Sequence, residues 1–142
     1  MRVDFYVLSE DAPDARLRWA CRLAEQAAEQ GTRVYLQTAG QAESQRLDEL
    51  LWTYNDRSFL PHEIFTGGPA PHAHVKVLLG DAAAPPWHRQ LVVNLTETIP
   101  ADLEQYERVA EIVDVDSGRK RSARERYKQY RERGCTLESH NV

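Results

Sequence analysis

The sequence predicts an α/β fold of three layers, in which a mainly parallel β-sheet is flanked by helices on both faces. Short apolar runs rich in β-branched residues alternate along the chain with segments whose apolar residues recur every three to four positions. In addition, Gly31 follows the first helical segment and can end it before the next strand. Strand, helix and strand in succession form a right-handed crossover, which builds a parallel sheet.

The first part of the chain alternates between the two patterns. Its elements are expected in this order: a strand at residues 3–8, a helix from Pro13 to Gly31, a strand at residues 33–37, and a helix from about Gln41 or Ser44 to Trp52.

Residues 54–71 are punctuated by Pro, Gly and polar residues, which predicts a loop with room for a short strand at residues 63–65. The later elements are expected in this order: strands at residues 74–79 and 90–94, a short helix at residues 103–106, a strand at residues 110–115, and a helix that Asp116 or Ser117 caps and Gly134 closes.

The bulk composition narrows the class of protein. With 142 residues and a formal net charge of −4, the chain is expected to be one domain, residues 1–142. No apolar run of about 18 residues occurs, so no membrane span is expected. Asp4 interrupts the first apolar run, which argues against a signal peptide and for a cytoplasmic location. Cys21 and Cys135 lie too far apart in sequence to suggest a disulfide framework or a thiol zinc site.

The residues that nucleotide, metal or nucleophile chemistry needs do not occur in the usual patterns. The first strand is followed by residues 9–14 (SEDAPD), which contain no glycine for a phosphate loop and three carboxylates that repel phosphate. His62, His72 and His74 have no acidic or thiol ligand at a short, defined spacing. We therefore expect no catalytic residue, no cofactor and no metal site.

A basic helix at residues 117–133 is the most informative functional pattern, because eight of the 18 Lys and Arg residues lie there. At 100° per residue the helix has a cationic ridge of Lys120, Arg124, Lys128 and Arg131, and an apolar stripe of Ala123, Tyr127 and Tyr130. On an acidic protein such clustering predicts an anionic partner, and cations beside an aromatic wall suit an acidic peptide. The alternative interpretation is a solvated face that Glu125 and Glu132 partly neutralise.

Two segments carry a family resemblance: residues 46–62 (RLDELLWTYNDRSFLPH) and residues 123–134 (ARERYKQYRERG). Together they resemble the chi subunit of bacterial DNA polymerase III. The first strand, the entry to the second strand at Gly31, and the strand at residues 109–113 match the family in the same order, so the resemblance extends over essentially the whole chain.

The resemblance implies a non-catalytic accessory protein of the clamp loader, with a Rossmann-like, nucleotide-binding-like fold that uses no nucleotide. It implies two protein partners: the psi subunit of the clamp loader and the acidic C-terminal tail of the single-stranded-DNA-binding protein. DNA would then be reached only indirectly. The tail site carries over onto Val113, Lys120, Arg124, Tyr127 and Lys128, and the psi site onto Trp52, Phe59 and Pro61.

The chemistry of these residue types agrees with those roles. Arg124 offers a planar fork for a terminal carboxylate, Val113 and Tyr127 can wall a pocket, and lysines add looser attraction. The alternatives are a nucleotide-dependent enzyme or ligand-binding protein of the same sheet architecture, and a protein that binds DNA directly. The acidic first turn opposes the former, and the net negative charge opposes the latter.

Overall fold

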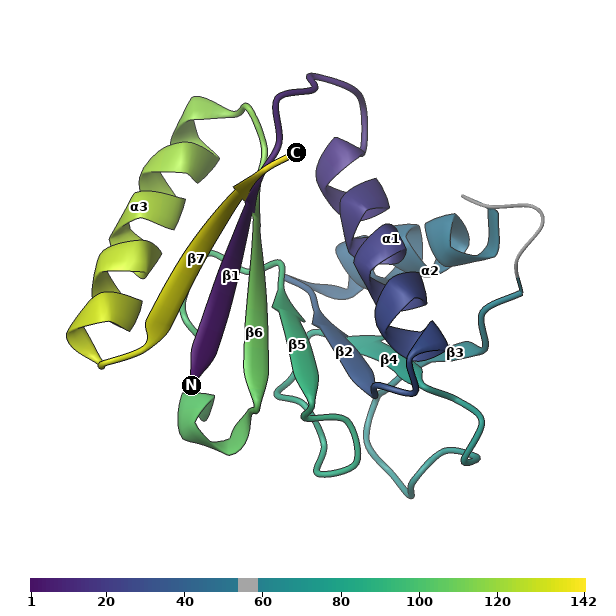
Figure 1. The fold of residues 1–142 in the computed structure, drawn as a ribbon. Coiled ribbons are helices and arrows are strands. Elements are labelled where there is room, and N and C mark those ends of the chain that lie inside the picture. The colour runs from purple at the N-terminus through teal and green to yellow at the C-terminus, as the bar shows by residue number, and fades with distance from the viewer. Residues whose placement is uncertain (54–58) are drawn as a thin grey trace.

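The computed structural model describes residues 1–53 and 59–142. One seven-stranded sheet has the strand order β3-β4-β2-β5-β6-β1-β7, and every neighbouring pair is parallel (Figure 1). The sheet is therefore wholly parallel where the sequence predicted a mainly parallel one. Along the chain the elements are β1 (Arg2–Val7), α1 (Ala15–Glu29), β2 (Val34–Gln37), α2 (Gln41–Thr53), β3 (His62–Ile64), β4 (Val77–Gly80), β5 (Leu91–Asn94), the 3-10 helix η1 (Leu103–Gln105), β6 (Arg108–Val113), α3 (Ser117–Glu132) and β7 (Thr136–Asn141).

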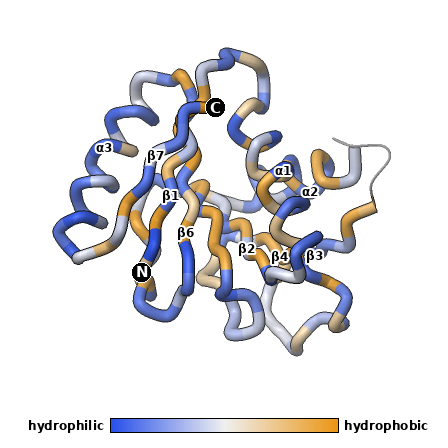
Figure 2. Tube along the Cα trace, viewed as in Figure 1, coloured by the Kyte–Doolittle hydropathy of each residue, from blue (hydrophilic) through white to orange (hydrophobic). Residues whose placement is uncertain are grey.

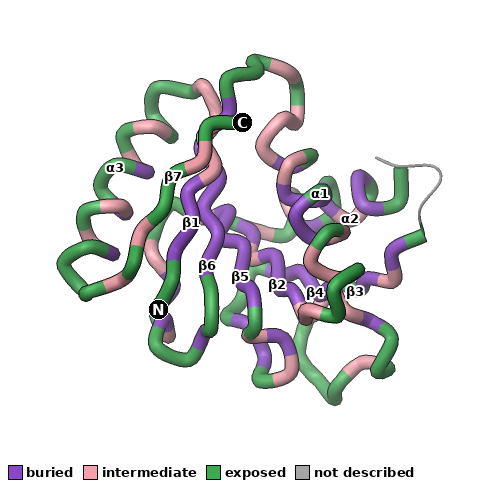
Figure 3. The backbone as a smooth tube through the Cα atoms, viewed as in Figure 1, coloured by how far each residue is buried: buried purple, intermediate pink, exposed green. Residues whose placement is uncertain are grey.

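Three layers result, with α1 and α2 on one face of the sheet and α3 on the other (Figure 1). Because side chains alternate across a strand, β1 sends Val3 and Phe5 into the cluster beneath α3, while β2 sends Val34 and Leu36 beneath α1 and α2. Apolar residues concentrate in the central strands (Figure 2), and the same segments are the buried ones (Figure 3). In the described part of the chain, no helix has both the length and the apolarity to cross a membrane.

Several predicted boundaries shift, and one strand is new. The strands predicted at residues 74–79 and 110–115 are observed as β4, from Val77 to Gly80, and β6, from Arg108 to Val113. The sequence pattern did not predict β7, because Leu137 is its only apolar residue. In the predicted loop at residues 54–71, residues 54–58 lie outside the described part, and β3 spans His62–Ile64.

Helix α3 is capped as its sequence predicts. The Asp116 side chain accepts a hydrogen bond from the backbone N–H of Arg119, and Gly134 has a φ of 80° just past the last turn. The residues that α3 buries are Ala123, Arg126 and Tyr130. By sequence Arg126 counts among the cations of the basic helix, but in the structure its side chain faces the sheet, so Arg126 does not belong to the basic surface.

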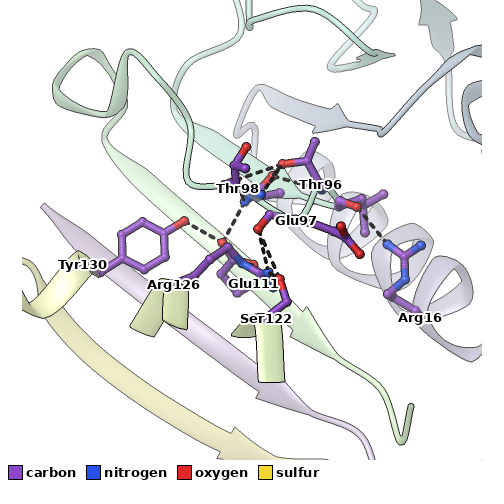
Figure 4. A network of polar contacts seen from close by, with 10 residues as sticks. Arg16, Thr96, Glu97, Thr98, Glu111, Ser122, Arg126 and Tyr130 are labelled. Atoms are coloured by element: carbon purple, nitrogen blue, oxygen red, sulfur yellow. Dashed lines mark hydrogen bonds and ion pairs between the residues drawn. The ribbon is translucent and has the colours of Figure 1, made fainter. Parts of the chain in front are cut away.

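A buried polar network explains why Arg126 faces inward (Figure 4). The carboxylate of Glu111, in the middle of β6, has no solvent exposure and accepts a hydrogen bond from Arg126 Nε at 3.0 Å. Its other oxygen accepts hydrogen bonds from the Tyr130 hydroxyl at 2.5 Å and from Asn94 Nδ2 at 2.8 Å. Burial raises the pKa of Glu111, and the Arg126 charge and these donors oppose that rise.

The same guanidinium joins a third segment to the network. Arg126 Nη1 donates to the Ser122 hydroxyl at 2.6 Å and to the backbone carbonyl of Glu97 at 3.3 Å. Through Arg126, helix α3 therefore makes hydrogen bonds both to β6 and to the segment that follows β5. These two contacts fix the position of the helix and its rotation about its own axis.

Replacing Arg126 with Met should destabilise the protein by about 3–5 kcal/mol, because it leaves the Glu111 carboxylate buried without its cation. Adding Glu111→Gln to Arg126→Met should recover a large part of that loss, since the uncompensated charge is gone. Urea denaturation followed by circular dichroism measures both changes.

Arg124→Met is the matched control, because Arg124 is exposed on the same helix, and it should change the free energy of unfolding by no more than about 0.5 kcal/mol. Equal unfolding free energies for Arg126→Met and Arg124→Met would show that the buried pair does not secure α3.

Candidate protein-binding sites

An apolar groove of about 290 Å³ lies between the N-terminal half of α3 and the strands beneath it. It is lined by Phe5 and Val7 of β1, Val113 of β6, Lys120, Ala123, Arg124 and Tyr127 of α3, and Ser139 of β7. Four of the five residues predicted for tail binding therefore meet in one cavity. The fifth, Lys128, is exposed on the same helix but does not line the groove.

Aromatic packing fixes the walls of this groove. The Tyr127 ring lies 5.2 Å from the Phe5 ring, centroid to centroid, at an interplanar angle of 59°. The Phe5 ring also lies 5.9 Å, centroid to centroid, from the fully buried Tyr130 ring, at an interplanar angle of 76°. These tilted contacts are favourable for aromatic pairs and hold Tyr127 half-buried at the rim.

Unpaired cations surround the groove. Arg124 and Lys120 make no hydrogen bond through their side chains and no ion pair with any residue in the described ranges 1–53 and 59–142, and the same holds for Lys128. Arg119, in contrast, pairs with Asp114 at 2.9 Å, and Arg126 pairs with Glu111. Lys120 and Arg124 therefore bring positive charge to the lining of the groove without a carboxylate partner among the described residues.

Three lining residues were not found from the sequence: Phe5, Val7 and Ser139. Phe5 and Val7 stand in the first strand, more than 100 residues before α3, and no local spacing connects them with it. Ser139 belongs to β7, the strand that the pattern missed. The one signal in the sequence was that Val3, Phe5 and Val7 occupy alternate positions, which places all three on one apolar face of β1.

Trp52 and Phe59 form a second feature, an exposed aromatic patch. Their rings lie 5.5 Å apart, and 51% of Trp52 and 72% of Phe59 is exposed, so neither residue belongs to the core. Pro61, two residues after Phe59 in the sequence, is half-buried. The two aromatic residues that the family resemblance assigns to the psi site thus lie together on the surface, and residues 54–58 between them are outside the described part.

His62 packs against the buried side of the aromatic patch. Its side chain is buried, its ring centroid lies 4.4 Å from that of Trp52, and its Nδ1 donates to the carbonyl of Leu60 at 2.7 Å. Nε2 lies 3.1 Å from an Asp48 carboxylate oxygen. His62 therefore packs against Trp52 and helps to fix the position of its ring.

Helix α3, which borders the groove, and α2, which carries Trp52, lie on opposite faces of the sheet (Figure 1). Helix α3 packs on β6 and β7 near one edge, whereas α2, which ends at Thr53, packs on β3 and β4 at the other edge. Two partners could occupy the two features without competing for space.

At the carboxyl end of the sheet, a cavity of about 540 Å³ lies between the segments that follow β1 and β6, the place where α/β proteins hold nucleotides. Its lining includes five carboxylates: Asp11, Asp14, Glu43, Asp114 and Asp116. Arg16 and Arg119 also line it, but they are paired with Glu43 and Asp114. An excess of carboxylates makes this crevice unsuited to phosphate.

A cluster of possible metal ligands lies on the α1 side of the β1–β7 pair. Atoms of Asp4, Glu138 and His140 are within 4.8 Å of one another. The Arg2 guanidinium already bridges the carboxylates, at 3.1 Å from Asp4 and 2.9 Å from Glu138. Burial raises the pKa of Asp4, but hydrogen bonds from His140 and Arg2 outweigh it and hold the pKa below its ordinary value. The cluster acts as an ion-pair network that attaches β7 to β1.

Comparison with known proteins identifies the family. The sequence model of the family described as DNA polymerase III chi subunit, HolC, matches residues 1–138. DNA polymerase III subunit chi of Pseudomonas aeruginosa is 40% identical over 141 residues, which cover 99% of this chain and 96% of the relative. The subunit of the same name in Haemophilus influenzae is 30% identical, and that of Escherichia coli is 28% identical over 94% of this chain and 92% of the relative.

The match extends over nearly the full length of both partners in each comparison, and it includes the two segments on which the resemblance was based. It also agrees with the expectation of an accessory subunit without a catalytic site. On this evidence the chain belongs to the family of the DNA polymerase III chi subunit.

Proposed function

We propose that this protein is a replisome adaptor of the bacterial cytoplasm that binds two other proteins and carries out no chemistry of its own. The groove beneath α3 receives the acidic C-terminal tail of the single-stranded-DNA-binding protein. The patch of Trp52 and Phe59 binds a psi-like subunit of the clamp loader. The 142 residues act as one domain that connects the clamp loader to the coated template.

The observation that carries the proposal is the chemistry of the groove. A tail that ends in an apolar residue has an apolar side chain and a carboxylate to place, and acidic residues precede them. The floor of Phe5, Val7 and Val113 is apolar, and Arg124 at its rim has no competing carboxylate within the described residues. This combination of a small apolar pocket and a free guanidinium suits such a peptide end.

The aromatic patch supports the second half of the proposal. Large exposed aromatic side chains are uncommon on a protein without a partner, and aromatic residues are enriched among the anchors of interfaces. Trp52 is held by His62 and the end of α2, so little conformational freedom is lost on binding.

Arg124→Ala should weaken binding of a tail peptide by about 2–5 kcal/mol, because it removes a charged hydrogen-bonding partner from a partly desolvated site. Arg124→Lys should restore only part of the loss, since lysine lacks the planar fork. Lys128→Ala should cost less, because Lys128 lies outside the groove, and affinity should fall as salt rises. Isothermal titration calorimetry measures each value.

Arg121→Ala is the matched control for this series, since Arg121 is exposed on α3 but does not line the groove. Wild-type affinity in Arg124→Ala would mean that the cationic ridge is an ordinary solvated surface.

Phe59→Ala should weaken the complex with the psi-like subunit by roughly 2 kcal/mol or more, as expected for a central aromatic anchor. Trp52→Ala should do the same, and both variants should bind the tail peptide as wild type does. Arg124→Ala provides the reciprocal control, because it should leave the psi complex intact. The assignment fails if neither aromatic replacement changes the affinity for psi.

The protein alone should bind single-stranded DNA only feebly, because its net charge is −4 and its exposed aromatics are not interleaved with cations as a stacking platform. Fluorescence anisotropy with a labelled oligonucleotide at physiological salt measures this binding. Addition of the single-stranded-DNA-binding protein should recruit the protein to the oligonucleotide. Submicromolar binding in the absence of that protein would contradict the proposed indirect contact.

A further inference from the structure

Strand β7 leaves one side of its backbone without a strand partner. It is the last strand of the sheet, and within residues 1–53 and 59–142 its only neighbouring strand is β1. The N–H of Thr136 donates to the carbonyl of Met1 at 2.9 Å, and the N–H of Val142 donates to the carbonyl of Val7 at 3.0 Å. Because backbone groups alternate along a strand, Leu137, Ser139 and Asn141 direct their N–H and C=O groups to the open edge.

This open edge adjoins the groove. The Ser139 side chain lines the groove, and the backbone of the same residue faces outward. The opposite edge of the sheet is far shorter, since β3 has three residues whereas β7 has six. In Figure 1, β7 lies beside α3, and no strand of the described part of the chain pairs with its outer edge. A six-residue open edge next to an unfilled groove is a template for an added strand.

The two sides of this edge differ in charge. On the α3 side, Arg124, Lys128 and Arg131 follow one ridge, and all three are exposed. On the other side, the Glu138 carboxylate is exposed and is held by Arg2. An added strand with acidic side chains would therefore be attracted on its α3-facing positions, which recur every second residue.

The spacing of the cations along α3 and the direction of β7 both suit an added peptide strand. Arg124 and Arg131 are seven helical residues apart, roughly 10 Å along the axis, which is about three residues of extended chain. Helix α3 connects two parallel strands and so runs antiparallel to β7. A peptide whose carboxyl end is at Arg124 and whose earlier residues reach Arg131 must run in the same direction as β7.

From this geometry we infer that the acidic tail docks by strand addition: its last residue fills the groove, and the residues before it pair with Leu137 and Ser139 of β7 as an eighth, parallel strand. This inference rests on the proposed tail site and adds its binding mode. Affinity then comes partly from the peptide backbone, and the acidic residues contribute in alternation, strongly where they face α3 and weakly where they face Glu138.

A scan of N-methylated peptides tests the pairing. The probe is a synthetic peptide of about eight residues, mostly acidic, with an apolar last residue and a free carboxylate. Single N-methyl groups remove one N–H each without changing a side chain. Methylation should weaken binding by about fivefold to tenfold at alternate positions and hardly at all between them.

The protein side is tested with Ser139→Pro, which removes an outward N–H while leaving the ladder to β1 intact. Ser139→Ala is the matched control, because it keeps the N–H and loses only the hydroxyl. Because both variants lose the hydroxyl that lines the groove, the comparison between them isolates the N–H: the proline variant should bind the peptide about fivefold to tenfold more weakly than the alanine variant, and both should keep the circular dichroism of the wild type.

The outcomes separate this inference from the proposed function. If the unmodified peptide binds and depends on Arg124, but no N-methyl position matters, the tail site stands and strand addition is overturned. If the peptide does not bind at all, both are overturned. A concentration-dependent dimer that Ser139→Pro dissociates would assign the edge to a second copy of the chain and would also overturn the inference.

Discussion

The Glu111 carboxylate is buried without access to solvent in the middle of the sheet, and its need for a cation determines which residues α3 exposes. Glu111 requires a cation, and Arg126 is the residue of α3 that provides it. Arg124 and Lys128 each lie two positions from Arg126 in the sequence. At 100° per residue, their side chains are therefore about 200° around the helix axis from the inward-facing Arg126, on the outer side of α3. The buried pair thus determines which cations of the basic helix face outward, although neither of its residues lines the groove.

Much of the fold could be predicted because its strands are apolar and its helices carry ordinary end signals. The caps of α3 and the central strands follow directly from local sequence. Glu111 and Arg126 could not be predicted as a buried pair, since a Glu in a strand and an Arg in a basic segment both read as solvated residues. Strand β7 was missed for a related reason: side-chain pairs with Arg2 and Asp4 stabilise it where apolar burial does not.

The candidate sites were likewise predicted in part from the sequence and in part not. Val113, Tyr127 and Arg124 were named from the sequence because a family pattern connects them, and the structure brings them into one groove. The contribution of β1 to that groove depends on the register of distant strands, which no spacing rule reports. Carboxylates line the crevice where related architectures hold nucleotides, and the two binding sites that we propose lie elsewhere, beneath α3 and at the end of α2.

The strand order also bears on how the chain reaches its folded state. Strand β1 pairs with β6 and β7, so that Val3 lies opposite Val109 and Leu137, and these contacts span more than 100 residues of the sequence. Such distant pairings must close a long loop before they contribute, which slows folding and leaves β1 exposed in the meantime. During synthesis, the apolar face of the first strand must therefore stay unpaired until β6 has left the ribosome, and chaperones have the most to protect in that interval.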